Sequence, residues 1–383
     1  MRNTTINALL VGLSIGGFTS ANASDVNKNL TLNTQLSDNA KFIYTLNNKN
    51  GEYIGLIYQI DSVNGSLHFK SQQSFKLSHQ ELSSLNIAPD GKHAYLLSSD
   101  QIYAYDIDQT TGELTRNTNF DIYDDSGNIV NFSAIKFHTN GKYIYTVSYH
   151  RLIGKINIAV WELQNGKYAL VNTISDNIKR NSTKLDINLS NDNRYLYIST
   201  RVDSQMLSYQ ISDDGKSINY LNSTKIDKPI LWSFTLDQTN NHLFTFNSNN
   251  EVVNMGEYVQ TGNTLQNIKN TQLSVLSYLQ EPLFSSDSHF IYGLGCNNYD
   301  GHGALYNINP ETLALSLISS GGILSCFNAK FNIDRQGSYL YLYADEASQL
   351  RSFSINKQNG SISAINQLDV PKDVITKSIS IKN

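Results

Sequence analysis

The residues best suited to chemistry lie in short polar segments between strand-like stretches. His150 is followed directly by Arg151, and Arg201 stands two residues before Asp203. An imidazole can activate water as a general base, and a guanidinium can hold the negative charge that develops on a carbonyl oxygen. We therefore interpret His150 as a candidate catalytic base, with Arg201 or Arg151 as the catalytic cation. The alternative is a surface ion pair between Arg201 and Asp203 beside a solvated His150.

A second set of polar residues could bind a ligand. Asp300, His302, Asp345 and Glu346 offer oxygen and imidazole groups from neighbouring repeats. Such groups can also bind metal ions, but their spacing matches no loop with defined ligand positions. We expect them to form a hydrated rim that contacts a ligand, with no metal and no cofactor. Trp232 could line the same rim, or it could pack within the fold.

Seven copies of one aromatic pattern define the architecture. In each copy a short turn is followed by a strand, and the last aromatics of successive copies lie 47 to 52 residues apart. This period is typical of a four-stranded propeller blade. The sequence therefore predicts an all-β fold, a seven-bladed β-propeller of four-stranded antiparallel blades. The copies are 41–44, 92–95, 142–145, 194–197, 242–244, 289–292 and 338–341.

A second repeated string marks a turn between the third and fourth strands of a blade. It begins with an apolar residue followed by Asp or Asn, and it ends with a second apolar residue after the turn. The turn usually contains Gly, which can adopt a positive φ. Because an open array would expose edge strands to pairing, we expect the ring to close. We expect segments 30–34 and 374–381 to meet in one sheet and latch it. The string occurs at 60–67, 107–114, 308–313 and 355–362.

The composition and the first residues bound the partners and the location. Charged residues are 16% of the 383 and the net charge is -4, which leaves no broad basic surface for nucleic acid. Residues 1–23 resemble a secretory signal, although a retained amphipathic anchor is an alternative. No later segment reaches the roughly 18 to 20 apolar residues that a membrane span needs. We expect residues 24–383 to form a single propeller domain that is monomeric and either periplasmic or secreted.

Export would allow the two cysteines to form a disulfide. Cys296 ends the second strand of repeat six and Cys326 begins the first strand of repeat seven. In a propeller both points lie on the same rim of neighbouring blades. Closing a loop of about 30 residues would stabilise the fold by about 3–4 kcal/mol. The alternative is a pair of buried thiols that pack as small hydrophobic groups.

The repeated strings resemble those of the seven-bladed lactonase-type propellers. The turn 89–92 with its aromatic strand, followed by the string 105–114, carries the resemblance, which covers roughly residues 30 to 370. That family includes bacterial 6-phosphogluconolactonase and the fungal muconate-lactonising enzymes. The stretch 196–204 is similar to a family string of Asn-Arg-Gly-x-Asp-Ser type, and this resemblance implies that Arg201 is the functional arginine, with Asp203 and Ser204 beside it.

The chain departs from this family pattern at three points, and two hypotheses follow. Val202 replaces a glycine, the segment 147–151 lacks an Asn-Glu pair, and a Pro-x-His-x-His string is absent. The first hypothesis is an exported, non-enzymatic propeller that binds a protein, a glycan or a small ligand through its loop rim. The second is a lactonase-type hydrolase that opens a sugar lactone at the channel mouth.

Overall fold

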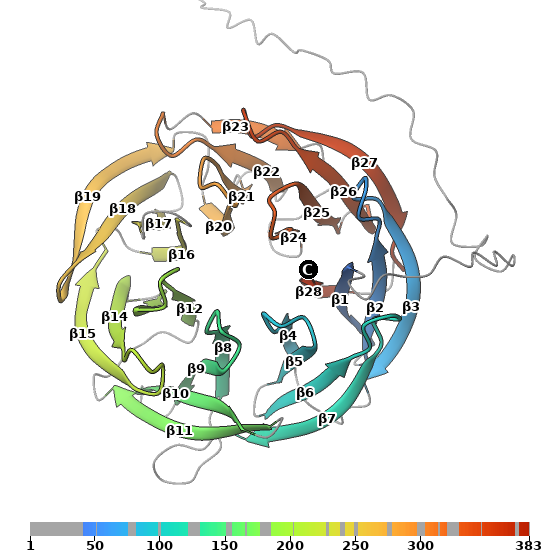
Figure 1. The fold of residues 1–383 in the computed structure, drawn as a ribbon. Helices are drawn as coiled ribbons and strands as arrows, with labels where there is room; N and C mark the ends of the chain where they lie inside the picture. The colour runs from blue at the N-terminus through green and yellow to red at the C-terminus, as the bar shows by residue number, and fades with distance from the viewer. Residues whose placement is uncertain are drawn as a thin grey trace, which may run out of the picture.

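The computed structural model contains strands, turns and loops and, within its described residues, no helix. The strands form seven four-stranded antiparallel sheets, and Figure 1 shows these sheets arranged as blades around a central axis. The predicted seven-bladed propeller is confirmed. The structure describes residues 41–50, 52–75, 82–98, 101–121, 131–150, 155–164, 167–176, 185–201, 203–226, 230–237, 242–248, 252–273, 278–296, 303–312, 315–319, 329–345, 347–371 and 375–382.

Each blade has four strands, A to D, from the axis outward. Blades 1 to 3 consist of β28 (Ile375–Lys382), β1 (Lys41–Lys49), β2 (Glu52–Ile60) and β3 (Leu67–Phe75); β4 (Leu82–Ile87), β5 (His93–Ser98), β6 (Gln101–Ile107) and β7 (Leu114–Asp121); and β8 (Asn131–Phe137), β9 (Tyr143–His150), β10 (Lys155–Gln164) and β11 (Lys167–Asp176). Blades 4 and 5 consist of β12 (Leu185–Leu189), β13 (Tyr195–Thr200), β14 (Gln205–Ile211) and β15 (Ile218–Lys225); and β16 (Ile230–Leu236), β17 (His242–Ser248), β18 (Val253–Thr261) and β19 (Thr264–Leu273). Blades 6 and 7 consist of β20 (Tyr278–Phe284), β21 (Ile291–Cys296), β22 (Gly303–Ile308) and β23 (Leu315–Ser319); and β24 (Lys330–Ile333), β25 (Tyr339–Ala344), β26 (Gln349–Ile355) and β27 (Ile362–Asp369).

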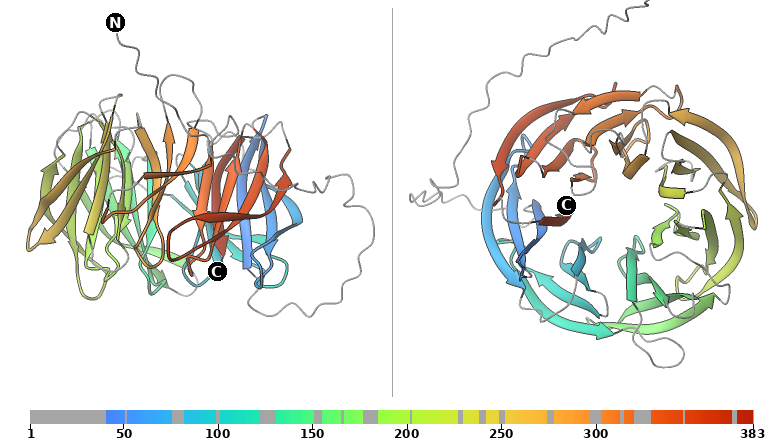
Figure 2. Two further views of the ribbon diagram at one scale, coloured as in Figure 1. Left: turned by 90° about the horizontal axis from the view of Figure 1, so that it is seen from above. Right: turned by 180° about the vertical axis from the view of Figure 1, so that it is seen from behind.

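The connections between strands collect on two opposite faces, as the side view in Figure 2 shows. Because neighbouring strands are antiparallel, the A–B and C–D turns share one face, here called the turn face. The B–C loops and the connections between blades share the other, here called the loop face. Every A strand therefore runs from the loop face to the turn face.

The C-terminal strand closes the ring. Strand β28 is the A strand of blade 1 and pairs with β1, for example Ile381 with Ile43. It is also bonded to both neighbouring blades: Leu85 N donates to Ser378 Oγ at 3.0 Å, and Asn332 Nδ2 donates to the Ile379 carbonyl at 3.2 Å. The prediction that the C-terminal segment latches the ring is thus confirmed, while its predicted partner, segment 30–34, lies outside the described residues.

The hydrophobic core lies between the blades. The buried apolar residues of the described chain form clusters that each combine two adjacent blades, and together these clusters cover all seven joints. The aromatics of the B strands contribute to several of these joints, and Phe42 and Tyr145 are fully buried. Burial of apolar area between blades is therefore the main force that holds the ring together.

The two repeated strings of the sequence meet in these joints. Tyr44 Oη in blade 1 donates to the Gly112 carbonyl in the C–D turn of blade 2 at 2.9 Å. The Phe42 ring covers the same glycine, so closely that a Cβ there would lie 2.8 Å from a ring carbon. Tyr145 and Tyr292 bond in the same way to Gly215 and Gly360 of the following blades. The turn glycine is therefore needed for its positive φ and for close packing against the preceding blade.

Candidate functional site

A polar channel follows the axis of the propeller. It has a cavity volume of about 490 Å³ and is lined by residues of all seven A strands. Strand register places its side chains in two rings. The first ring stands opposite the aromatic markers of the B strands, as Lys136 does opposite Tyr145. The second ring lies two positions earlier, nearer the loop face. The cavity-lining members are Asn86, Lys136, Asn188, Thr235, Leu283 and Asn332 in the first ring, and Ser84, Ala134, Asp186, Ser233, Glu281, Lys330 and Ser378 in the second.

An ion pair between two blades lies in the second ring. Lys330 Nζ at the start of β24 is 2.5 Å from Glu281 Oε1 in β20. The register of β20 shifts between Gln280 and Leu283, and Glu281 has a φ of +50° within this bulge. A left-handed conformation at a residue other than glycine costs about 1–2 kcal/mol, and such strain is concentrated at functional sites. The bulge places the Glu281 carboxylate on the cavity wall, where Lys330 meets it.

A second Lys and carboxylate lie on the opposite part of the wall. Lys136 of β8 belongs to the first ring, and Asp186 of the neighbouring strand β12 belongs to the second. Burial lowers the pKa of the Lys136 amine, while the negative charge of Asp186 acts in the opposite direction. The channel therefore holds two amines in different electrostatic environments. Lys330 is paired directly with a carboxylate, and the half-buried Lys136 has a lowered pKa despite the charge of Asp186.

The rim residues predicted from the sequence are partly described. Arg201, Asp203 and Ser204 lie in the B–C loop of blade 4, and none of them is among the described residues that line the channel cavity. The Arg201 carbonyl accepts a hydrogen bond from Leu231 N at 3.3 Å. Ser204 is 3% exposed with a φ of +50°, so its backbone shapes the loop. Asp345 lies in a turn where Ser348 N donates to its carbonyl at 3.0 Å.

The other predicted site residues lie outside the described part of the chain. These are Arg151, Asp300, His302, Glu346 and Cys326, together with the side chains of His150, Trp232 and Cys296. Their predicted roles, including the disulfide, stay predictions.

The charged residues of the second ring, Asp186, Glu281 and Lys330, were not predicted from the sequence. They lie inside short A strands, whereas most of the predicted site residues lie in polar loops. One signal was present: most alternate positions before the A–B turns carry polar or charged residues, such as Ser84 and Asn86 before the turn at 88–92. In a half-buried strand these positions face one side of the sheet. A charge at such a position, as at Asp186 or Lys330, marks a channel residue.

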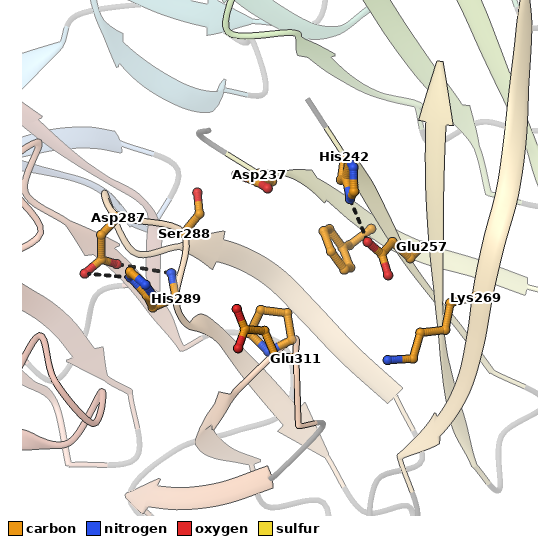
Figure 3. A pocket seen from close by; sticks show the side chains of 10 residues that line it. Asp237, His242, Glu257, Lys269, Asp287, Ser288, His289 and Glu311 are labelled. Carbon is orange, nitrogen blue, oxygen red and sulfur yellow. Dashed lines mark hydrogen bonds and ion pairs between the residues drawn. The ribbon is translucent and has the colours of Figure 1, made fainter. Parts of the chain in front are cut away.

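A second cavity of about 370 Å³ opens on the turn face between blades 5 and 6. Figure 3 shows two histidines in it, each directed to its own carboxylate. His242 Nδ1 lies 2.6 Å from Glu257 Oε1, and His289 Nδ1 lies 3.4 Å from Asp287 Oδ2. Within the described ranges, no group of three His, Cys, Asp or Glu side chains is arranged to hold a metal ion. The two histidines therefore act first as partners of local carboxylates.

Comparisons with known proteins agree with this architecture. A family model described as "Lactonase, 7-bladed beta-propeller" matches residues 78–277. Uncharacterized proteins of Staphylococcus aureus strains USA300 and NCTC 8325 are 27% identical over 188 residues, 48% of this chain and 51% of theirs. The chain thus spans about half the length of the curated relatives it matches.

Solved structures match over almost the whole chain. A protein of Bacteroides uniformis proposed to be a 6-phosphogluconolactonase has a TM-score of 0.67 at 16% identity, over 90% of this chain and 100% of its own. The periplasmic gluconolactonase of Pseudomonas aeruginosa has a TM-score of 0.64 at 14% identity, over 88% and 99%. At these identities the likeness is one of fold. No helix of the described residues is long and apolar enough to span a membrane.

Proposed function

The chain belongs to the lactonase family of seven-bladed β-propellers, and from this premise we propose that it hydrolyses a sugar lactone within its central channel. The observation that carries the proposal is the second channel ring, where Asp186, Glu281 and Lys330 line one cavity. A volume of about 490 Å³ is in the range of small-ligand sites. The amide and hydroxyl side chains of both rings suit a ligand rich in hydroxyl groups.

The reaction requires a base and a cation, and the ring offers both. A sugar lactone is a cyclic ester, so water must attack its carbonyl carbon while the ring C–O bond breaks. Glu281 is paired with Lys330 at 2.5 Å, and we assign the transfer of the proton from water to Asp186, the carboxylate on the other part of the cavity wall. Lys330, whose Nζ lies beside Glu281, would stabilise the negative charge on the carbonyl oxygen. The proton taken by Asp186 then passes to the leaving ring oxygen, and the product is a hydroxy acid.

The predicted signal and a structural neighbour bear on the choice of substrate. The predicted signal at residues 1–23 would bring the protein outside the cytoplasm, where phosphorylated sugars are scarce. An unphosphorylated lactone is therefore the first substrate to test, and the Pseudomonas aeruginosa neighbour is a periplasmic gluconolactonase. The non-enzymatic binding hypothesis gains no support from the family match or from the solved structures, which favour the hydrolase hypothesis.

The test is hydrolysis of glucono-δ-lactone by the purified protein, followed by the loss of lactone and corrected for the spontaneous rate. We expect Asp186→Asn to lower kcat/KM by about 100-fold or more, the usual contribution of a general base. Glu113→Gln, which removes an exposed carboxylate of a C–D turn, is the matched control and should be neutral. Thermal unfolding of each variant establishes that it is folded.

The same assay separates the channel from the rim. If Arg201→Ala abolishes hydrolysis and Asp186→Asn does not, the chemistry belongs to the rim and the channel assignment is wrong. If the wild-type protein does not accelerate hydrolysis of any sugar lactone, the proposed function itself is wrong.

A further inference from the structure

The two lysines of the channel differ in their partners. Lys330 Nζ lies 2.5 Å from a carboxylate oxygen of Glu281, and its side chain is 19% exposed. Lys136, by contrast, has no direct carboxylate partner of this kind among the described residues, and the charge that acts on it is that of Asp186. An amine that is partly desolvated and has no direct carboxylate partner loses its proton more readily than a solvated one. The proposed lactone hydrolysis uses Lys330 and leaves Lys136 without a role.

The surroundings of Lys136 keep carboxylates away from direct contact. Its flanking residues in the first ring are Asn86 on β4 and Asn188 on β12, and both are uncharged amides. The opposite B-strand residue, Tyr145, uses its hydroxyl to donate to the Gly215 carbonyl at 3.0 Å. Asp186 is the charged group facing the cavity from the neighbouring described A strand.

Farther around the wall, Glu281 and Lys330 face the same cavity and neutralise each other. Burial lowers the pKa of Lys136 despite the opposing charge of Asp186. An amine with a lowered pKa acts as a nucleophile more readily, and the cavity of about 490 Å³ leaves room for a reactant beside Lys136.

We infer that Lys136 is a nucleophilic amine that forms a reversible imine with a short hydroxylated aldehyde bound in the channel. This activity goes beyond the proposed lactone hydrolysis and needs no lactone. The hydroxylated class follows from the lining, because Ser84, Asn86, Asn188 and Asn332 present hydroxyl and amide groups that bind hydroxyls.

The step balances without any oxidant or reductant. The Lys136 nitrogen attacks the aldehyde carbon, a C–N bond forms, and a nitrogen proton moves to the carbonyl oxygen to give a carbinolamine. Loss of the hydroxyl group as water, with a proton supplied through Asp186 and solvent, leaves the protonated imine. Addition of water reverses the sequence and releases the aldehyde.

The test is reductive trapping on the wild-type protein. Glyceraldehyde and cyanoborohydride are added at pH 7, and the labelled lysines are mapped and timed by peptide mass spectrometry. We expect Lys136 to be labelled at least tenfold faster than Lys330. It should also be labelled at least tenfold faster than Lys142 and Lys216, although their side chains are 52% and 48% exposed.

Two controls, propanal and the Lys136→Arg variant, also test the inference. Propanal has the same carbon chain without hydroxyl groups, and we expect it to label Lys136 at least fivefold more slowly than glyceraldehyde. Lys136→Arg, which keeps the positive charge but cannot form an imine, should leave the labelling of Lys330 unchanged. The inference is overturned if labelling of all lysines simply follows their exposure, or if propanal labels Lys136 as fast as glyceraldehyde. Because the mapping requires no lactone turnover, it succeeds or fails independently of the hydrolase assay.

Discussion

The contact between an aromatic residue and a turn glycine of the next blade can be tested with a matched pair of substitutions. Gly112 and Gly141 both have a positive φ, +77° and +70°. A Cβ at Gly112 would lie 2.8 Å from a ring carbon of Phe42, whereas a Cβ at Gly141 would have no heavy atom within 4 Å. The left-handed backbone costs both alanine variants about 1–2 kcal/mol, so this term cancels between them.

The difference between the two variants comes from the blade joint. Phe42 is 0% exposed, so overpacking against its ring adds about 1–3 kcal/mol to Gly112→Ala. The same shift disturbs the hydrogen bond from Tyr44 Oη to the Gly112 carbonyl, which contributes about 1 kcal/mol. We therefore expect Gly112→Ala to lower the free energy of unfolding by about 2–4 kcal/mol more than Gly141→Ala.

Urea unfolding of both variants, followed by fluorescence and circular dichroism, measures this difference. Phe42→Leu provides a second arm, because a smaller side chain leaves room for the new methyl group. In that background, Gly112→Ala should cost no more than Gly141→Ala. Equal destabilisation of the two glycine variants in the wild-type background would refute the reasoning that the turn glycine is required for packing between blades.

Three further predictions concern charge and closure. The hydrogen bond from Lys142 lowers the pKa of Glu162 to about 2. The ionised carboxylate therefore stabilises the fold above the ordinary carboxyl pKa, and this stabilisation is lost as the pH falls toward 2. We expect Glu162→Gln to lower the melting temperature more at pH 7 than at pH 2. The hydrogen bond to Asp90 raises the pKa of His93, so His93→Gln should destabilise most below the ordinary imidazole pKa, near pH 5.5, and least at pH 9, again by melting temperature. Removal of β28 exposes the edge of β1, and we expect the shortened chain to lose cooperative unfolding and to aggregate in light scattering. The first two expectations would be contradicted if the loss of melting temperature in each variant did not change with pH. The third would be contradicted if the chain without β28 stayed monomeric and unfolded in one sharp transition.

The architecture was predictable because both halves of the blade joint are local strings. The aromatic markers and the C–D glycines each repeat along the sequence with the blade period, as Tyr44 and Gly112 do. What the sequence did not reveal is that these strings contact each other, because the partners are 68 residues apart. The strand position of the terminal segment was also open. It follows from the ring, in which blade 1 lacks an A strand until β28 supplies one.

The channel site could not be derived in the same way. Glu281 and Lys330 are 49 residues apart, and they meet only because adjacent blades bring corresponding positions of their A strands together. The bulge in β20 is a local departure from the repeat, and it decides that Glu281 faces the channel. No periodic pattern contains that information. The rim residues were easier to notice since they stand in polar loops, yet those loops vary in length and their geometry does not follow from the blade period.

The division between joints and channel explains how such a ring can change its chemistry. The stabilising apolar area lies between blades, in clusters that adjacent B and C strands dominate, whereas the A-strand positions that line the cavity are mostly small and polar. A substitution such as Asn86→Asp or Ser233→Glu therefore alters the channel charge without opening a cavity in the core. The charges at Asp186, Glu281 and Lys330 lie on three different blades, so each can be changed separately. A propeller with this core can keep its fold while the reaction in its channel differs, which is why similarity of fold alone does not establish the substrate.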